Sequence, residues 1–123
     1  MARILLADDE EPVLDLIEKA LRPLGHPADR AQNGREAMVL LSENDYDVLV
    51  TDLVMPERTG LDLVQTLRMR HIMIPIIVLS AFVTPDVRRE LEHYEGVEVV
   101  SKPFKPEALA DLVKRSLERT IEK

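Results

Sequence analysis

The chain has 123 residues, 46% of them hydrophobic, which suits one domain with a single buried core, and we expect that domain to span residues 1–123. The formal net charge of -7 disfavours direct binding to nucleic acid or to an anionic membrane, so a basic partner or a divalent cation fits better. Cysteine is absent, which excludes disulfides and thiolate metal ligands, and no apolar run is long enough for a signal peptide or a membrane span; we therefore expect a soluble cytoplasmic protein.

The first two elements are a strand and an amphipathic helix. Residues 3–7 are predicted as a strand buried on both faces, because the run from Ile4 to Ala7 is short and continuously apolar. Pro12 suits the first turn of a helix, and Gly25 is a plausible stop. Between them, apolar residues recur at intervals of three and four, as one face of a helix requires: Val13, Leu14, Ile17, Leu21 and Leu24.

The next strand is the least clear of the set. Residues 27–31 have a poor composition for a strand, and we place one there because Gly25 precedes the segment while Asn33 and Gly34 follow it. A second helical pattern covers residues 35–43.

The remaining elements continue this alternation. They are predicted in the order strand 48–51, helix 60–70, strand 76–79, helix 85–94, strand 97–100 and helix 106–121. The last two helices open with Pro85 and Pro106, and Thr84 is a plausible cap. Five strands alternating with five helices predict an α/β fold with a parallel sheet covered on both faces, because each crossover must return the chain to the same edge.

Polar side chains stand where the predicted strands end. Asp8 and Asp9 follow the first strand, Asp52 the third and Ser80 the fourth, while Lys102 comes shortly after the fifth. The carboxyl ends of parallel strands share one edge, where α/β folds bind ligands. If the first and third strands are neighbours, each carboxylate pair at 4 Å repels by about 4 kcal/mol at an effective dielectric constant of 20.

This repulsion can be relieved by retained protons or by a hard divalent cation such as Mg²⁺. The cation accounts for more of the residues, since Lys102 and Ser80 could then bind a phosphoryl group drawn to it. Asp52, at the end of an inner strand, is the carboxylate best held for nucleophilic attack on that group. The Ser80 hydroxyl could instead simply satisfy a backbone group at the strand end.

Four segments in this order resemble the response-regulator receiver family over essentially the whole chain. They are ILLADDE, VLVTDLVMPERTGLDL, IIVLSA and VVSKPF. The resemblance implies a flavodoxin-like, doubly wound sheet of five parallel strands in the order 2-1-3-4-5, an order that the residue pattern alone does not fix.

The resemblance also implies residue roles around the acids. Asp52 would be the phosphoacceptor, and Mg²⁺ would be held by Asp8, Asp9, Asp52 and the backbone carbonyl of Val54. Lys102 would bind one phosphoryl oxygen.

Other positions match the family around this centre. Ser80 would occupy the switch position and bond another phosphoryl oxygen, with the small Ala81 beside it. Pro103 stands where the family places a cis peptide, and Gly60 stands in the turn after the acceptor, where glycine would relieve a strained backbone.

Two features set the predicted switch apart. Val99 occupies a position where the family commonly has Tyr or Phe, so the usual aromatic movement is excluded and output by another route is expected. Val54 and Phe82 occupy positions that tune phosphoryl lifetime in the family. Since neither apolar side chain can orient an attacking water, we expect slow loss of phosphate.

The partners implied by the resemblance are proteins. A sensor histidine kinase or a histidine phosphotransfer protein would dock near the first helix, and a downstream effector or an output domain outside this chain would read the modified state. A homodimer could form through the fourth helix, fifth strand and fifth helix. The chain would then act as a self-phosphorylating acceptor rather than a turnover enzyme.

Other functions remain as alternatives. A phospho-independent, receiver-like interaction scaffold is conceivable because of Val99. A haloacid-dehalogenase-type phosphatase needs a second aspartate where Val54 stands, and a flavodoxin needs a phosphate loop where this chain has four acids. No GxxxxGKS loop supports nucleotide hydrolysis.

Overall fold

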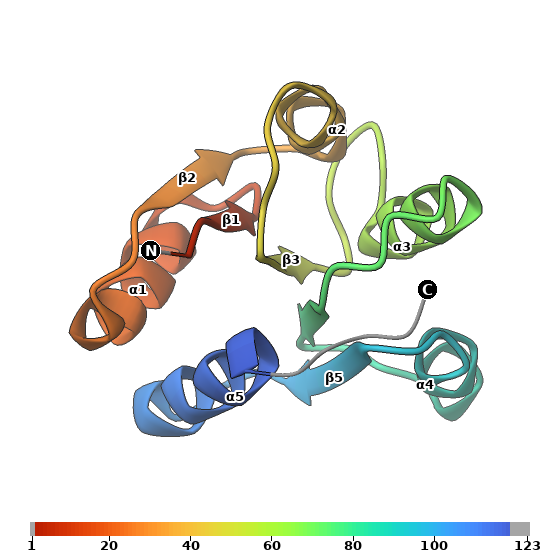
Figure 1. Cartoon of the computed structure of the whole chain (residues 1–123). Helices are drawn as coiled ribbons and strands as arrows, with labels where there is room; N and C mark the ends of the chain where they lie inside the picture. The colour runs from red at the N-terminus through yellow and green to blue at the C-terminus, as the bar shows by residue number, and fades with distance from the viewer. Residues whose placement is uncertain (1, 119–123) are drawn as a thin grey trace.

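Strands and helices alternate along residues 2–118, the part of the chain that the computed structural model describes (Figure 1). The strands are β1 (Ile4–Ala7), β2 (Ala28–Ala31), β3 (Val48–Asp52), β4 (Ile76–Ser80) and β5 (Val97–Ser101). The helices are α1 (Glu11–Leu21), the short 3₁₀ helix η1 (Arg22–Leu24), α2 (Gly34–Glu43), α3 (Gly60–Met69), α4 (Pro85–Glu92) and α5 (Pro106–Glu118). Each predicted element is present, with described ends within two residues of those expected, except that the first helix, expected to reach Leu24, ends at Leu21 and is followed by η1. Residues 119–121, expected in the last helix, lie outside the described residues.

The five strands form one parallel sheet in the order β2-β1-β3-β4-β5. This confirms the predicted α/β fold, including the strand order that the family resemblance implied. The neighbours β1 and β3 pair Ala7 with Thr51, so Asp8 and Asp52 follow this pair directly. The register therefore brings the acids of two separate segments to the same edge of the sheet.

The sheet is buried on both faces because its side chains alternate between two hydrophobic clusters. In β1, Leu5 and Ala7 pack in the cluster that includes residues of α2, α3 and α4, while Ile4 and Leu6 pack with α1 and α5. Figure 1 shows α1 and α5 together on one side of the sheet. All residues of β1 are fully buried, as its continuously apolar sequence predicted.

Side-chain caps fix where three helices begin. Asn33 accepts a hydrogen bond from the backbone N–H of Glu36, and Thr84, the predicted cap, accepts one from Val87. Thr59 and Asp62 form a capping box at α3. These bonds set the helix starts relative to the strand ends, and therefore hold the loops that carry the polar residues.

Arg68 fastens the other edge of the sheet, where β4 and β5 begin. Its guanidinium donates hydrogen bonds to the backbone carbonyls of Ile72 at 2.7 Å, Ile74 at 2.9 Å and Glu95 at 2.8 Å. Burial lowers the pKa of Arg68, although a guanidinium stays protonated in a protein. The connections into β4 and β5 are thus held by one side chain of α3.

No helix within residues 2–118 has both the length and the apolar character that crossing a membrane requires.

Candidate functional site

Three carboxylates meet at the carboxyl edge of the sheet. Asp8, Asp9 and Asp52 each place an oxygen within 4.8 Å of the others. Asp8 is fully buried, the Asp52 side chain is 13% exposed, and Asp9 faces solvent. The sequence expectation that these acids crowd together is confirmed for all three residues.

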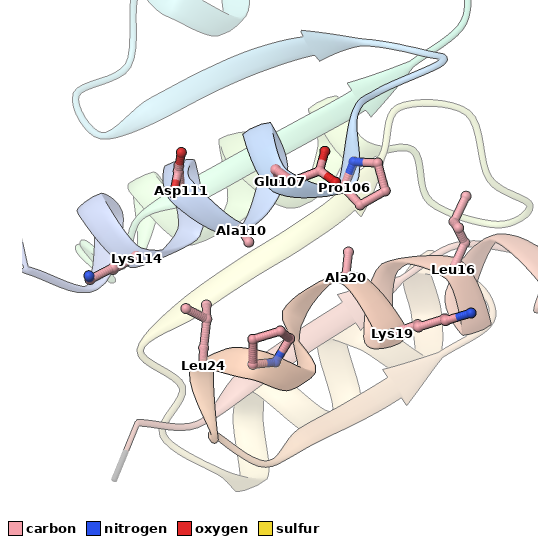
Figure 2. Close-up of a pocket in the computed structure, with 10 residues that line it drawn as sticks. Leu16, Lys19, Ala20, Leu24, Pro106, Glu107, Ala110, Asp111 and Lys114 are labelled. Carbon is pink, nitrogen blue, oxygen red and sulfur yellow. The ribbon is translucent and has the colours of Figure 1, made fainter.

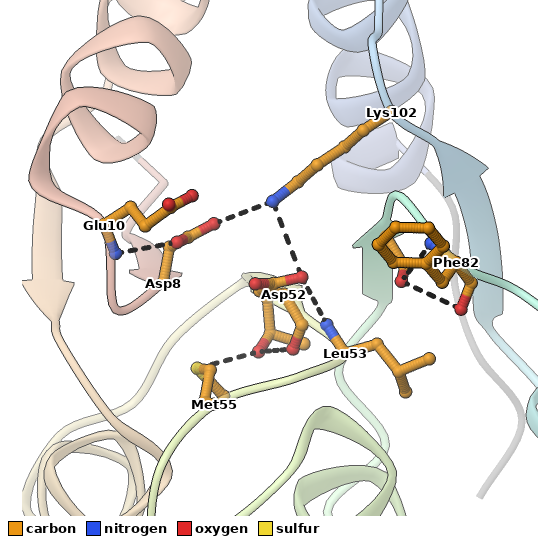
Figure 3. A network of polar contacts seen from close by, with 9 residues as sticks. Asp8, Glu10, Asp52, Leu53, Met55, Phe82 and Lys102 are labelled. Atoms are coloured by element: carbon orange, nitrogen blue, oxygen red, sulfur yellow. Dashed lines mark hydrogen bonds and ion pairs between the residues drawn. The ribbon is translucent and has the colours of Figure 1, made fainter.

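Lys102 projects into this cluster from the end of β5 (Figure 3). Its Nζ lies 3.1 Å from Oδ2 of Asp8 and 3.5 Å from Oδ1 of Asp52. The backbone N–H of Lys102 donates to the carbonyl of Ser80 at 2.8 Å, and the Lys102–Pro103 peptide bond is cis, as the resemblance implied. One ammonium group therefore bridges the two carboxylates that are most deeply buried.

Backbone donors orient the two buried carboxylates. Oδ1 of Asp52 accepts the N–H of Leu53 at 2.8 Å, and Oδ1 of Asp8 accepts the N–H of Glu10 at 2.9 Å (Figure 3). Within residues 2–118, no hydrogen bond occupies Oδ2 of Asp52. Sequence reasoning missed both donors, because an amide N–H belongs to every residue but proline and carries no side-chain signal.

The cluster has more negative than positive charge, with three carboxylates and one ammonium group. Burial raises the pKa of Asp52, and the charge of Asp8 adds to that, while Lys102 and the N–H of Leu53 act in the opposite direction. Burial alone would lower the pKa of Lys102, but its hydrogen bond to Asp8 and the charge of Asp52 outweigh it, so the pKa is raised. One lysine thus faces three acids, and a small divalent cation with oxygen ligands fits the remaining negative charge.

Ser80 lies beside the cluster, but its hydroxyl group contacts the backbone of the loop after β4. Oγ accepts the N–H of Phe82 at 3.2 Å and lies 3.3 Å from the Phe82 carbonyl. The Ser80 side chain is buried, whereas Ala81 is exposed and Phe82 is 84% exposed. The simpler alternative for Ser80, satisfying a strand-end backbone group, describes its present contacts, and the phosphoryl contact stays a prediction.

Position 99 is filled by a half-buried valine that packs against the core. Arg88 of α4 approaches this region instead, with one nitrogen 3.5 Å from the carbonyl of Val99 and another 3.5 Å from Oγ of Ser101. The same guanidinium pairs with Glu92 at 3.5 Å. Arg88 therefore adds polar contacts to the apolar packing of α4 on β5, and sequence reasoning did not identify it.

The expected reason for Gly60 is wrong. Its backbone does not adopt a left-handed conformation; a Cβ atom there would lie 2.5 Å from the carbonyl oxygen of Asp52. Glycine is required because the start of α3 packs directly against the end of β3, where the N–H of Gly60 donates to the carbonyl of Leu53 at 2.8 Å. The left-handed residue of this loop is Glu57, at φ 70°.

Two connected hollows lie along α1, and one of them adjoins the cluster at Lys102. One, of about 340 Å³, is lined by Val13, Leu16, Ala81, Lys102, Pro103 and Phe104. The other, of about 570 Å³, lies between α1 and α5 and carries charges of both signs on its walls (Figure 2). Leu16 lines both, so the apolar surface beside Lys102 continues along α1.

Comparison with known proteins decides the family. The model described as the response regulator receiver domain matches residues 4–114. The chain belongs to this family. It is therefore a receiver domain of the kind used in two-component signalling, where such domains work with histidine kinases and output domains.

Relatives of this receiver domain include larger regulators. It is 37% identical over 117 residues to the gliding motility regulatory protein of Myxococcus xanthus, covering 92% of this chain and 15% of that protein. It is 31% identical over 119 residues to response regulator SaeR of Staphylococcus aureus, covering 97% of this chain and 52% of SaeR. The chain thus spans about half of SaeR and much less of the Myxococcus protein.

Solved structures agree over nearly the full length. The receiver domain of Francisella response regulator 1452 is 30% identical with a TM-score of 0.88, covering 97% of this chain and 98% of that one. The chemotaxis response regulator CheY4 of Vibrio cholerae is 29% identical with a TM-score of 0.84, covering 94% and 98%. The receiver domain of a signal transduction histidine kinase from Syntrophus aciditrophicus is 32% identical with a TM-score of 0.83, covering 96% and 91%.

Proposed function

We propose that this receiver domain is a phosphorylation-operated switch of the cytoplasm. Asp52 accepts a phosphoryl group from the phosphohistidine of a sensor histidine kinase or a histidine phosphotransfer protein, in a reaction that requires Mg²⁺. The observation that carries the proposal is the convergence of Asp8, Asp9 and Asp52 within 4.8 Å beside the ammonium group of Lys102.

The transfer uses the two oxygens of Asp52 differently. Oδ1 is held by the N–H of Leu53 and faces Lys102, so Oδ2, which has no hydrogen bond within residues 2–118, is the nucleophile. A bond forms between Oδ2 and phosphorus while the phosphorus–nitrogen bond of the donor breaks, and the imidazole leaves with that electron pair and takes up a proton. Lys102 and the Ser80 hydroxyl then bind phosphoryl oxygens.

The acids fit Mg²⁺ by their chemistry, since this ion prefers carboxylate oxygens and retains several waters. Asp8, Asp9, Asp52 and the Val54 carbonyl would hold it, and the bound ion would neutralise charge on the transferring group. Asp8 is oriented for this task by the N–H of Glu10. Each chain accepts one phosphoryl group on Asp52, so the domain acts as a phosphoacceptor and not as an enzyme that turns over substrate.

Partner binding follows from the surfaces around the site. The hollow beside Lys102 and its continuation along α1 give the phosphodonor protein an apolar surface next to Asp52. Phosphorylation shifts a two-state equilibrium toward a form that binds an effector or an output domain. The face formed by α4, β5 and α5 is the candidate for this output and for a homodimer, with Arg88 in place of an aromatic switch.

The test is incorporation of phosphate from acetyl phosphate with Mg²⁺, read by intact mass, together with amide NMR spectra in beryllofluoride. We expect the wild type to gain one phosphoryl group and to change its spectrum only when Mg²⁺ is present. Asp52→Asn should do neither, whereas Asp45→Asn, which alters an exposed acid elsewhere, should behave as the wild type.

A silent wild type would overturn the proposal in favour of the phospho-independent scaffold, whose acids bind metal without accepting phosphate. Equal incorporation into the wild type and Asp52→Asn would place the acceptor elsewhere.

A further inference from the structure

Three arginines surround a shallow hollow between α2 and α3, on the face of the sheet opposite α1 and α5. The hollow has a volume of about 320 Å³ and is lined by Arg35, Met38, Val39, Ser42, Arg58 and Arg70. Arg35, Arg58 and Arg70 are all exposed, in a chain whose formal net charge is -7. This surface is therefore positively charged although the protein as a whole is acidic.

The charges of these arginines are not neutralised within residues 2–118. None of the three takes part in an ion pair there, and Arg58 makes one side-chain hydrogen bond, to Oγ1 of Thr66 at 3.2 Å. By contrast, Arg3 and Arg30 both pair with acids. Three like charges around one hollow repel one another, and an anionic partner would relieve that repulsion.

An apolar track runs through the same surface. A second hollow of about 330 Å³ is lined by Arg35, Glu36, Val39 and Leu40, so it shares Arg35 and Val39 with the first. Val39 is 48% exposed, while α2 buries Gly34 and Ala37. The two hollows form one strip, which we call the α2–α3 strip. It has an apolar centre, three arginines around the first hollow, and Arg35 beside Glu36 in the second.

We infer that the α2–α3 strip docks an acidic, amphipathic segment of a partner protein. Guanidinium groups bind carboxylates through paired hydrogen bonds, and the apolar centre suits the Leu- or Ile-type side chains that alternate with acids in such a segment. Nucleic acid is a poorer fit, because no aromatic side chain lines either hollow to stack on a base.

The strip also touches the loop that follows Asp52. The N–H of Gly34, at the start of α2, donates to the carbonyl of Pro56 at 3.4 Å. A Cβ atom on Gly34 would lie 2.2 Å from the carbonyl oxygen of Arg58, so α2 and this loop are in direct contact. A bound segment would therefore lie next to the phosphoacceptor loop, although docking does not depend on Asp52 being phosphorylated.

Fluorescence anisotropy with a labelled synthetic peptide of alternating Glu and Leu residues tests the inference on the full chain. We expect saturable binding that weakens with salt. The double variant Arg35→Glu/Arg70→Glu should bind about tenfold more weakly, since reversal of two exposed charges replaces attraction by repulsion. Val39→Ser should weaken binding without changing its salt dependence.

Arg22→Glu is the matched control, because it reverses an exposed arginine of η1 that is outside the strip and should leave the affinity unchanged. Circular dichroism verifies that each variant is folded. Absence of saturable binding, an equal loss in Arg22→Glu, or tighter binding of a single-stranded oligonucleotide through the same arginines would overturn the inference. Asp52→Asn should retain peptide binding, so failure of the docking inference can be told apart from failure of the phosphorylation proposal.

Discussion

Replacing Asp52 by Asn should stabilise the metal-free protein, because it removes one of three crowded negative charges. Carboxylate oxygens within 4.8 Å repel by at least about 3.5 kcal/mol per pair at an effective dielectric constant of 20, and the Lys102 ammonium at 3.5 Å attracts Asp52 by about 4.7 kcal/mol. Solvent screens the exposed Asp9. The attraction to Lys102 nearly cancels the repulsion from Asp8, so the cost of burying the Asp52 charge, which is the main cause of its raised pKa, decides the sign. We expect a gain of about 1 to 2 kcal/mol in the free energy of unfolding.

The assay is thermal and urea unfolding of the wild type and Asp52→Asn in EDTA at neutral pH, where this gain corresponds to a rise in Tm of about 4 to 8 °C. Because the folded-state pKa of Asp52 is raised, the wild type loses stability as the pH rises from the ordinary carboxyl range through that pKa. The advantage of the variant should therefore shrink as the pH falls toward about 4.

Magnesium should reverse the order. Binding to the folded wild type adds stability according to the ion concentration over its Kd, whereas Asp52→Asn lacks one ligand and gains less. Asp45→Asn is the control and should match the wild type in both buffers. If Asp52→Asn is less stable than the wild type in EDTA, or if Mg²⁺ does not stabilise the wild type, the electrostatic reasoning is wrong.

Two further predictions concern the loops around Asp52. Gly60→Ala should lower the free energy of unfolding by about 1 to 3 kcal/mol and slow phosphorylation, because the new Cβ would lie 2.5 Å from the carbonyl oxygen of Asp52. Gly25→Ala is the control: its backbone would be strained at φ 76°, but its Cβ would lie in open space, so it should lower stability without slowing phosphorylation. The phosphorylated form should persist for minutes or longer in Mg²⁺ after the donor is removed, because the exposed apolar side chains of Val54 (63%) and Phe82 (84%) cannot orient a water. Val54→Asn should shorten this lifetime. A wild-type lifetime of seconds would contradict the prediction.

Much of the fold could be predicted because its strands are buried on both faces. Continuous apolar runs such as β1 and β4 have few other interpretations, and the helices between them have a clear amphipathic period. β2 has the sequence ADRA, and it was placed only by the turn residues around it. Strand order depends on long-range pairing that a single sequence does not contain, and it came from the family resemblance.

The convergence of Asp8, Asp9, Asp52 and Lys102 could also be predicted, because residues that follow parallel strands share one edge. What could not be predicted depends on contacts between distant segments. The close approach that requires Gly60 involves the end of β3, and the gathering of Arg35, Arg58 and Arg70 joins two helices and a loop. The orientation of the Ser80 hydroxyl depends on the path of the loop after β4.

The edge of the sheet that Arg68 holds should respond less to salt and pH than the edge that carries the acids. Its three hydrogen bonds go to neutral carbonyl groups, so neither salt nor titration of acids removes an acceptor. If Asp52 is phosphorylated as proposed, we expect the carboxyl edge of the sheet to change while the edge held by Arg68 keeps its geometry. A signal that starts at Asp52 would then act on the loops of the carboxyl edge and on the contact of Arg88 with the end of β5.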